Sequence, residues 1–182
     1  VEIGVGLIPA GGGCLNLWKK YLQNIPEAVT DFDLAKIFVP VFKNIAMAQF
    51  SSSAAHARSL GFLGHRDRIV FNPDYLIGES KKEVLHMVGA GYITPFKRKI
   101  KVFGDTAQGV VNTELFNLQS AGYASEYDVY LARRVAFVIS GGDIRYGSEI
   151  EEDVILTLER ETFVDLWKER SEEHTSELQS LL

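Results

Sequence analysis

The first fourteen residues hold the side chains best suited to chemistry. Glu2 begins an apolar run, and that run ends in Pro9 and three consecutive glycines, Gly11 to Gly13. A carboxylate can act as a general acid or base, and glycines let a ligand approach the backbone closely. Cys14 follows the glycines, and a thiol at a helix start can be activated as a thiolate. The segment therefore predicts either a binding site or a tight turn between two elements.

The glycines do not have the spacing of a dinucleotide-binding loop. Such a loop has the pattern Gly-x-Gly-x-x-Gly after a strand, with an acidic residue about 20 positions further on. Here Gly4 and Gly6 are followed by Pro9, and the next glycine is Gly11. We therefore expect no nucleotide at this segment. Because no histidine lies near Cys14 in the sequence, we interpret Cys14 as a buried packing residue.

The spacing of apolar residues predicts a mostly helical chain with a few short strands. Ile3 to Ile8 is predicted to be a buried strand that leads into the glycine-rich loop. Two more short strands are predicted at 68–71 and 100–103. Helical spacing and capping residues predict helices over 14–21, 32–49, 54–60, 72–88, 104–120, 125–140 and 148–168.

Two of these helices carry more specific expectations. Pro40 lies inside the helix at 32–49 and should kink or split it, because proline lacks an N–H group and its ring clashes with the preceding turn. The last helix is expected to turn its glutamates and arginines to solvent. Its buried side is predicted to consist of Ile150, Val154, Leu158 and Val164.

The composition is that of a soluble globular protein, with 46% hydrophobic and 24% charged residues. The net charge of −5, without a long basic run, gives no support for a nucleic-acid partner. No stretch approaches the ~20 apolar residues of a membrane span. A single cysteine excludes an intrachain disulfide and fits a reducing, cytoplasmic location. His56, His65 and His86 lack ligand spacing, so we predict no metal site.

Several segments resemble the crotonase (enoyl-CoA hydratase/isomerase) superfamily. Residues 2–14, Glu-Ile-Gly-Val-Gly-Leu-Ile-Pro-Ala-Gly-Gly-Gly-Cys, resemble its signature of an acidic residue, an apolar strand, Gly-x-x-Pro and small residues that enter a helix. Residues 53–63 resemble the small-residue helix that follows. Three later segments, 67–72, 132–143 and 158–163, are similar to the C-terminal part of bacterial bifunctional 3-hydroxyacyl-CoA dehydrogenase/enoyl-CoA hydratases.

The resemblance implies an α/β fold: the C-terminal part of a crotonase-like ββα spiral with a helical extension. It also implies hydration of a trans-2-enoyl-CoA to a 3-hydroxyacyl-CoA in fatty-acid β-oxidation. Two backbone N–H groups would polarise the thioester carbonyl, and two glutamates would activate water and deliver a proton. Glu2 matches the second of these glutamates. Gly6, Pro9, Gly11 and Gly12 would form a wall of the acyl-thioester pocket.

The resemblance further implies a longer parent protein. The first glutamate and the oxyanion-hole amides lie upstream in the family, so we expect these 182 residues alone to be inactive as a hydratase. The parent would bind NAD in a separate dehydrogenase domain, act on an acyl-CoA thioester and form a homo-oligomer. Two alternatives remain open. One is enoyl-CoA isomerase or another CoA-thioester activity. The other is a non-catalytic crotonase-like domain that supports an NAD-dependent 3-hydroxyacyl-CoA dehydrogenase.

We expect three parts along the chain. Residues 1–99 would be the C-terminal half of a crotonase-like domain, and residues 100–169 a helical extension. Residues 170–182 would be a non-native tail, because Arg170 to Ser180 matches the translation of a common sequencing adapter.

The one basic cluster in the sequence is Lys97-Arg98-Lys99 with Lys101. It could meet the phosphates of CoA by charge attraction. It could equally be a solvated strand edge, where charged side chains prevent unwanted pairing. We favour the solvated edge.

Overall fold

The computed structural model describes residues 2–23, 25–26 and 28–180, with side chains described as far as Glu169. This part of the chain is mostly helical and contains one small sheet. Its elements, with 3-10 helices written η, are η1 (Glu2–Val5), α1 (Gly13–Leu22), α2 (Ala35–Ala46), α3 (Ala54–Ser59), η2 (Pro73–Tyr75), α4 (Leu76–Gly89), β1 (Ile100–Lys101), η3 (Gly104–Thr106), α5 (Ala107–Ser120), α6 (Glu126–Ile139), β2 (Glu149–Ile150) and α7 (Glu152–Ser180).

The predicted helices are present, and side-chain caps mark several of their starts. The Ser53 side chain accepts a hydrogen bond from the His56 N–H at the start of α3. Ser125 and Asp128 form a reciprocal capping box at the start of α6. Each cap satisfies N–H groups that a helix start leaves without a partner. These local interactions explain why the positions of the two helices could be predicted.

Helix α2 runs through Pro40 without a break. The proline is exposed, while Phe38, Val41 and Phe42 beside it are buried. A proline inside a helix costs about 3 kcal/mol, whereas each large apolar side chain contributes about 1.5–3 kcal/mol when fully buried. Packing of the three neighbours therefore holds the helix together, and the predicted split at Pro40 does not occur.

The strand predictions are confirmed in one place only. Ile100–Lys101 forms β1 and pairs antiparallel with β2, so that Ile100 lies opposite Ile150. The segment from Ile3 to Ile8 instead forms η1 and a turn, and 68–71 is irregular. A strand needs neighbouring strands to be stable, and the described residues supply none at these two places. The crotonase ββα spiral is thus not seen in this part of the chain, which is helical with a small sheet.

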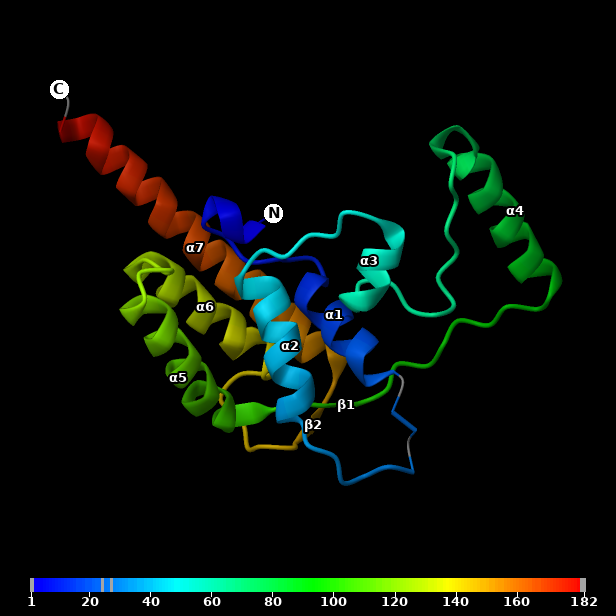
Figure 1. The fold of residues 1–182 in the computed structure, drawn as a ribbon, viewed down its shortest axis with the longest axis horizontal. Helices are drawn as coiled ribbons and strands as arrows, with labels where there is room; N and C mark the ends of the chain where they lie inside the picture. The colour runs from blue at the N-terminus through cyan, green and yellow to red at the C-terminus, as the bar shows by residue number, and fades with distance from the viewer. Residues whose placement is uncertain (1, 24, 27, 181–182) are drawn as a thin grey trace.

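The core lies where helices α1, α2, α6 and α7 pack together (Figure 1). Phe38 of α2 stacks on Phe103, with ring centroids 4.6 Å apart, and meets the edge of Trp18 of α1 at 6.4 Å. All three rings are buried. The indole N–H of Trp18 donates to the Lys101 carbonyl at 3.0 Å, which ties α1 to β1. Helix α5 packs against α6, and we call these five helices the body.

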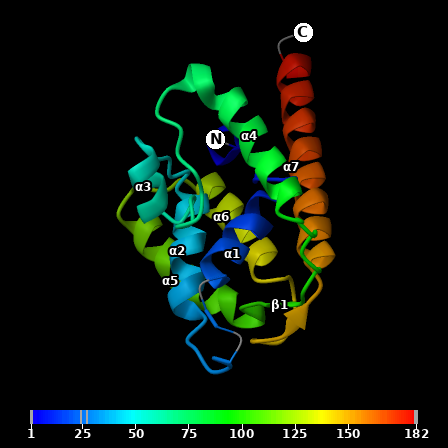
Figure 2. The same cartoon turned by 90° about the vertical axis from the view of Figure 1, so that its right-hand side faces the viewer.

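Helix α4 lies apart from the body (Figure 1), and it is nearest the viewer when the molecule is seen from the side of that helix (Figure 2). Two extended segments lead to it and away from it, and the element that packs against it is its own preceding 3-10 helix, η2. No residue of α4 is buried. We call residues 71–96, which include η2 and α4, the arm.

Candidate functional site

The predicted site residues Pro9, Gly11 and Gly12 share one tight turn before α1. Leu7 and Ile8 are buried just ahead of it. Gly12 has a φ of 96°, a left-handed conformation that side chains other than glycine rarely adopt. A Cβ atom on Gly13 would lie 2.7 Å from the Cβ of Pro9. The glycines are therefore explained by the turn itself, the alternative that the sequence left open.

The amide groups of this turn bind a buried carboxylate from the far end of the chain. Glu159 of α7 accepts hydrogen bonds from the Gly12 N–H at 2.5 Å and from the Leu15 N–H at 2.8 Å. The Gly12 residue that precedes α1 has no side chain to cap it, and the N–H groups of a helix start attract negative charge. Glu159 thus takes the place that a phosphate or a substrate oxyanion would occupy.

The environment of Glu159 acts on its carboxyl in two opposing ways. Its side chain is fully buried in the protein. Burial raises the pKa of the Glu159 carboxyl, and hydrogen bonds from the Leu15, Gly12 and Cys14 backbone oppose part of that rise. Burial dominates, so the folded protein holds a proton on this carboxyl to higher pH than an exposed glutamate would.

Cys14 is a buried thiol rather than a reactive thiolate. Its Sγ lies 3.4 Å from the Pro9 carbonyl, to which the thiol donates. Burial first, and then the charges of Glu159 and Glu2, hold the pKa of the Cys14 thiol well above its ordinary value. A nucleophilic cysteine needs the opposite shift. The interpretation of Cys14 as a packing residue is therefore confirmed.

The other two predicted site residues lie before the turn. Glu2 begins η1 with its side chain exposed, and its backbone carbonyl accepts a hydrogen bond from Leu7 N–H at 2.9 Å. Gly6 is half-buried, and its carbonyl accepts a hydrogen bond from the Tyr127 hydroxyl of α6 at 3.1 Å. The structure thus brings Pro9, Gly11 and Gly12 together on one turn. The roles predicted for all five residues stay predictions.

Sequence reasoning missed Glu159 because it assigned the wrong face of α7 to the core. Val154 and Val164 were expected to be buried, but they are 39% and 41% exposed. The buried residues lie at helical spacing on a neighbouring face: Ile155, Glu159, Thr162 and Leu166. Two polar residues interrupt this stripe, which hides it from a search for apolar periodicity.

A cavity of about 890 Å³ lies away from the turn, and none of the five predicted site residues lines it. Its lining includes Leu22, Phe32 and Phe96, together with Arg98, Lys99 and Lys101 of the basic cluster. The salt bridge between Lys19 and Glu152, at 2.6 Å, joins two more of its lining residues. One of the cations that border the cavity, Lys19, therefore already has an acidic neighbour.

The lysines of the basic cluster interact with the protein itself. Lys97 lies 3.0 Å from an oxygen of Asp153, and Lys99 lies 4.0 Å from Glu151. Lys101 donates to the Thr30 carbonyl at 2.7 Å. These contacts agree with a solvated, charge-balanced edge rather than with a phosphate site.

No group of three or more His, Cys, Asp or Glu side chains in the described part of the chain could hold a metal ion. None of the helices in the described residues has both the length and the apolar character needed to cross a membrane.

Comparison with known proteins gives one relative. The chain is similar to a protein of Bacillus subtilis (strain 168) named "Probable 3-hydroxyacyl-CoA dehydrogenase", with 36% identity over 166 residues. The similarity covers 91% of this chain and 20% of the relative, so the chain spans about a fifth of that protein's length. No family model matches the chain, and no solved structure matches it.

This relative overturns the main functional prediction. The relative is named as a dehydrogenase, not as a hydratase. The prediction of enoyl-CoA hydration was therefore wrong, and so was the priority given to it over a dehydrogenase-supporting role. It was drawn from an ordered set of segments that begins with the glycine-rich residues 2–14, and the structure accounts for the glycines of that first segment by the turn and by the Glu159 carboxyl.

Proposed function

We propose that this chain is a non-catalytic, crotonase-like region of a longer, NAD-dependent 3-hydroxyacyl-CoA dehydrogenase. The observation that carries the proposal is the 36% identity with a protein of that name over 91% of the chain. The parent protein would be a cytoplasmic oxidoreductase that acts on an acyl-CoA thioester and assembles as a homo-oligomer. Its hydride-transfer chemistry would take place outside these residues.

The environment of the turn supports a structural role. The Gly12 and Leu15 amides, which could have polarised a thioester carbonyl, already bind Glu159. An oxyanion hole needs donors that are free to meet the developing charge. The Glu159 carboxyl also occupies the space that an incoming anion would need at these amides. The turn therefore fastens α1 to α7 instead of holding a substrate.

The residues of the turn do not fit NAD either. A dinucleotide places its pyrophosphate on free N–H groups at a helix start. At α1 those of Gly12 and Leu15 are bonded to Glu159, and the glycine spacing differs from the dinucleotide pattern. We therefore propose that NAD binds in another region of the parent.

Several predictions about this region stay proposals. A rival proposal keeps Glu2 as a catalytic residue and Gly6, Pro9, Gly11 and Gly12 as contacts to an acyl-thioester, and the Glu2→Gln substitution separates it from the non-catalytic role proposed here. The division into 1–99 and 100–169 also remains a proposal. The body takes α1 and α2 from one side of that boundary and α5, α6 and α7 from the other. The suggested non-native tail, 170–182, lies outside the residues whose side chains are described.

The proposal is tested by measuring NADH formation from a 3-hydroxyacyl-CoA with the full-length parent. We expect turnover by the parent and none by the 182-residue chain alone. Glu2→Gln in the parent should leave kcat unchanged, as should the matched control Glu161→Gln on the exposed face of α7. If Glu2→Gln alone lowers kcat while the melting temperature is unchanged, the region is catalytic and the proposal fails.

Calorimetric titration of NAD into the 182-residue chain gives a second, independent test. We expect no heat of binding, since the helix start that would hold the pyrophosphate is filled by Glu159. Saturable binding that Glu159→Gln strengthens would place the cofactor at this turn and contradict the proposal.

A further inference from the structure

The arm carries a row of apolar side chains that nothing in the described chain covers. In helix α4, Ile77 is 84% exposed, Val84 58% and Val88 69%. Side chains that flank the helix are exposed to a similar or greater degree: Phe71 at 96%, Ile93 at 79% and Phe96 at 88%. Single exposed apolar residues are common, but several of them gathered on one short helix and the segments beside it are typical of an interaction surface.

The three apolar residues of α4 lie on one side of the helix. Successive residues turn by about 100° around an α-helix, so Ile77, Val84 and Val88 fall within about 40° of one another. We call these three residues the apolar stripe. By the same geometry Glu79 and Glu83 lie on the opposite side of α4.

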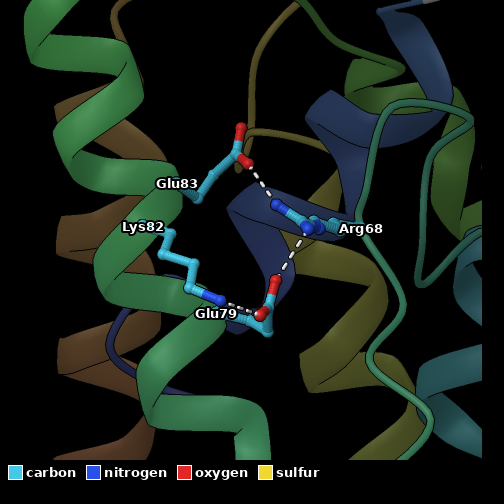
Figure 3. Close-up of polar contacts among 4 residues, drawn as sticks. All are labelled: Arg68, Glu79, Lys82 and Glu83. Carbon is cyan, nitrogen blue, oxygen red and sulfur yellow. Dashed lines mark hydrogen bonds and ion pairs between the residues drawn. The ribbon is translucent and has the colours of Figure 1, made fainter.

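The charged side of α4 is held by the arm's own connecting chain (Figure 3). Arg68 donates to Glu79 at 2.8 Å and to Glu83 at 2.7 Å, and Lys82 donates to Glu79 at 2.7 Å. The bidentate contact of one guanidinium with two carboxylates on successive turns sets the rotation of the helix. The apolar stripe therefore faces away from Arg68, toward solvent.

This arrangement is poorly stabilised if nothing covers the stripe. A helix of 14 residues is marginal in water by itself and relies on burial of an apolar face. Exposed ion pairs such as those of Arg68 contribute little. No apolar side chain of α4 is buried, so the described contacts supply almost none of the apolar packing that such a helix normally needs.

We propose that the apolar stripe docks into an apolar groove formed by the remainder of the parent polypeptide. This inference rests on the proposed function, namely that the chain is one region of a longer dehydrogenase. The relative has about four-fifths of its length outside the matched region. A surface on that additional chain is covalently tethered, and tethering raises its effective concentration at the arm.

Two other occupants fit the stripe less well. Pairing of α4 with a second copy of itself would need roughly three to four heptads of apolar spacing, but the stripe runs only from Ile77 to Val88. A helix that binds a membrane surface has a polar face rich in lysine and arginine. The polar side of α4 instead carries Glu79 and Glu83, bound by Arg68.

The test compares hydrogen exchange of the α4 amides in the full-length parent and in the 182-residue chain. We expect exchange at 76–89 to be at least about tenfold slower in the parent, since buried apolar contacts raise the cost of local opening. The double substitution Val84→Glu/Val88→Glu in the parent should restore the fast exchange of the isolated chain.

Phe116→Glu serves as the matched control. Phe116 is 69% exposed on α5, like Val88, but its helical neighbours, such as Asn112 and Ser120, are polar and exposed. This substitution should leave α4 exchange in the parent unchanged.

Three outcomes would overturn the proposal. One is equal exchange of α4 in parent and isolated chain, and another is slow exchange in the parent that Val84→Glu/Val88→Glu does not alter. The third is slow exchange in the isolated chain that increases on dilution, which would identify a second copy as the occupant. The docking and the proposed function fail separately: a protected arm without NADH formation rejects only the function, and NADH formation with an unprotected arm rejects only the docking.

Discussion

Helices α4 and α6 have the same length, 14 residues each, but opposite environments. Helix α6 buries seven of its residues, including Leu131, Val135 and Ile139, whereas α4 buries none. Both sequences alternate apolar and charged residues at helical spacing. The difference shows that local sequence can specify a helix. Whether the apolar side of that helix is buried in the core or exposed on the arm depends on the surface against which the helix packs.

The largest expected difference comes from the same truncation in each helix. Leu131→Ala in α6 removes a side chain that is 1% exposed, and it should lower the free energy of unfolding by about 2–5 kcal/mol. Leu85→Ala in α4, where the leucine is 60% exposed, should stay within about 0.5 kcal/mol. Urea denaturation of the 182-residue chain measures both. Equal losses would mean that the arm packs against the body in solution.

The next effect tests the carboxylate that fastens α7 to α1. Glu159→Ala leaves the Gly12 and Leu15 amides without their partner, at about 1–3 kcal/mol for each buried group left unsatisfied. Glu161→Ala, on the exposed side of the same helix, is the control and should have little effect. Thermal unfolding followed by circular dichroism distinguishes the two. A Glu159 variant as stable as the control would show that water replaces the carboxylate at no cost.

A smaller effect is expected from pH. The pKa of Glu159 is raised in the folded protein, so the folded state holds its proton to higher pH than the unfolded state. Its contribution to stability is therefore greatest below the ordinary pKa of a glutamate and falls as pH rises through the raised pKa. The unfolding free energy of Glu159→Gln, measured over the same pH range, should lack this component. If the contribution of Glu159 to the unfolding free energy of the wild-type protein grew as pH rose, the pKa of Glu159 would not be raised by folding.

The smallest effect is expected at the contact that holds the arm helix. Arg68→Ala removes both ion pairs to Glu79 and Glu83, which are exposed to solvent. The midpoint of global unfolding should not move measurably, because exposed pairs are weak. Amide exchange at 76–89 should nevertheless become faster, since the helix loses the contact that fixes its rotation. An unchanged exchange rate would show that Arg68 does not restrain α4.

The parts of the fold that could be predicted are those with local causes. Ser53 and Ser125 mark helix starts because their hydroxyls bond to N–H groups within the same turn. The glycines before α1 also have a local cause: Gly11 and Gly12 adopt the positive φ angles that a tight turn requires. Ile100 was placed in a strand correctly, although its partner strand, β2, had been assigned to the last helix. Wherever the stabilising contact lies within about four residues, the sequence alone was sufficient.

The errors concern contacts between distant residues. Ile3 to Ile8 has the composition of a strand, but a strand forms only beside another, and none lies there in the described chain. Glutamate is a residue type that usually faces solvent. Glu159 is nevertheless buried, because the start of α1, 144 residues earlier, presents backbone N–H groups that donate hydrogen bonds to its carboxyl. Apolar periodicity carries no information about a polar residue whose partner comes from another element.

The sequence by itself therefore determined the helical segments, the turn at Gly11 to Gly13 and the burial of Cys14, because propensity, capping and hydrophobicity act over a few residues. Only the tertiary structure decided that Glu159 fills the start of α1 and that α4 remains outside the body. Both depend on which surfaces meet, and that is set by the packing of whole helices. The acyl-thioester contact predicted at the glycine-rich turn came from the family resemblance, which carries no information about the Glu159 carboxyl that the folded protein places against the same turn.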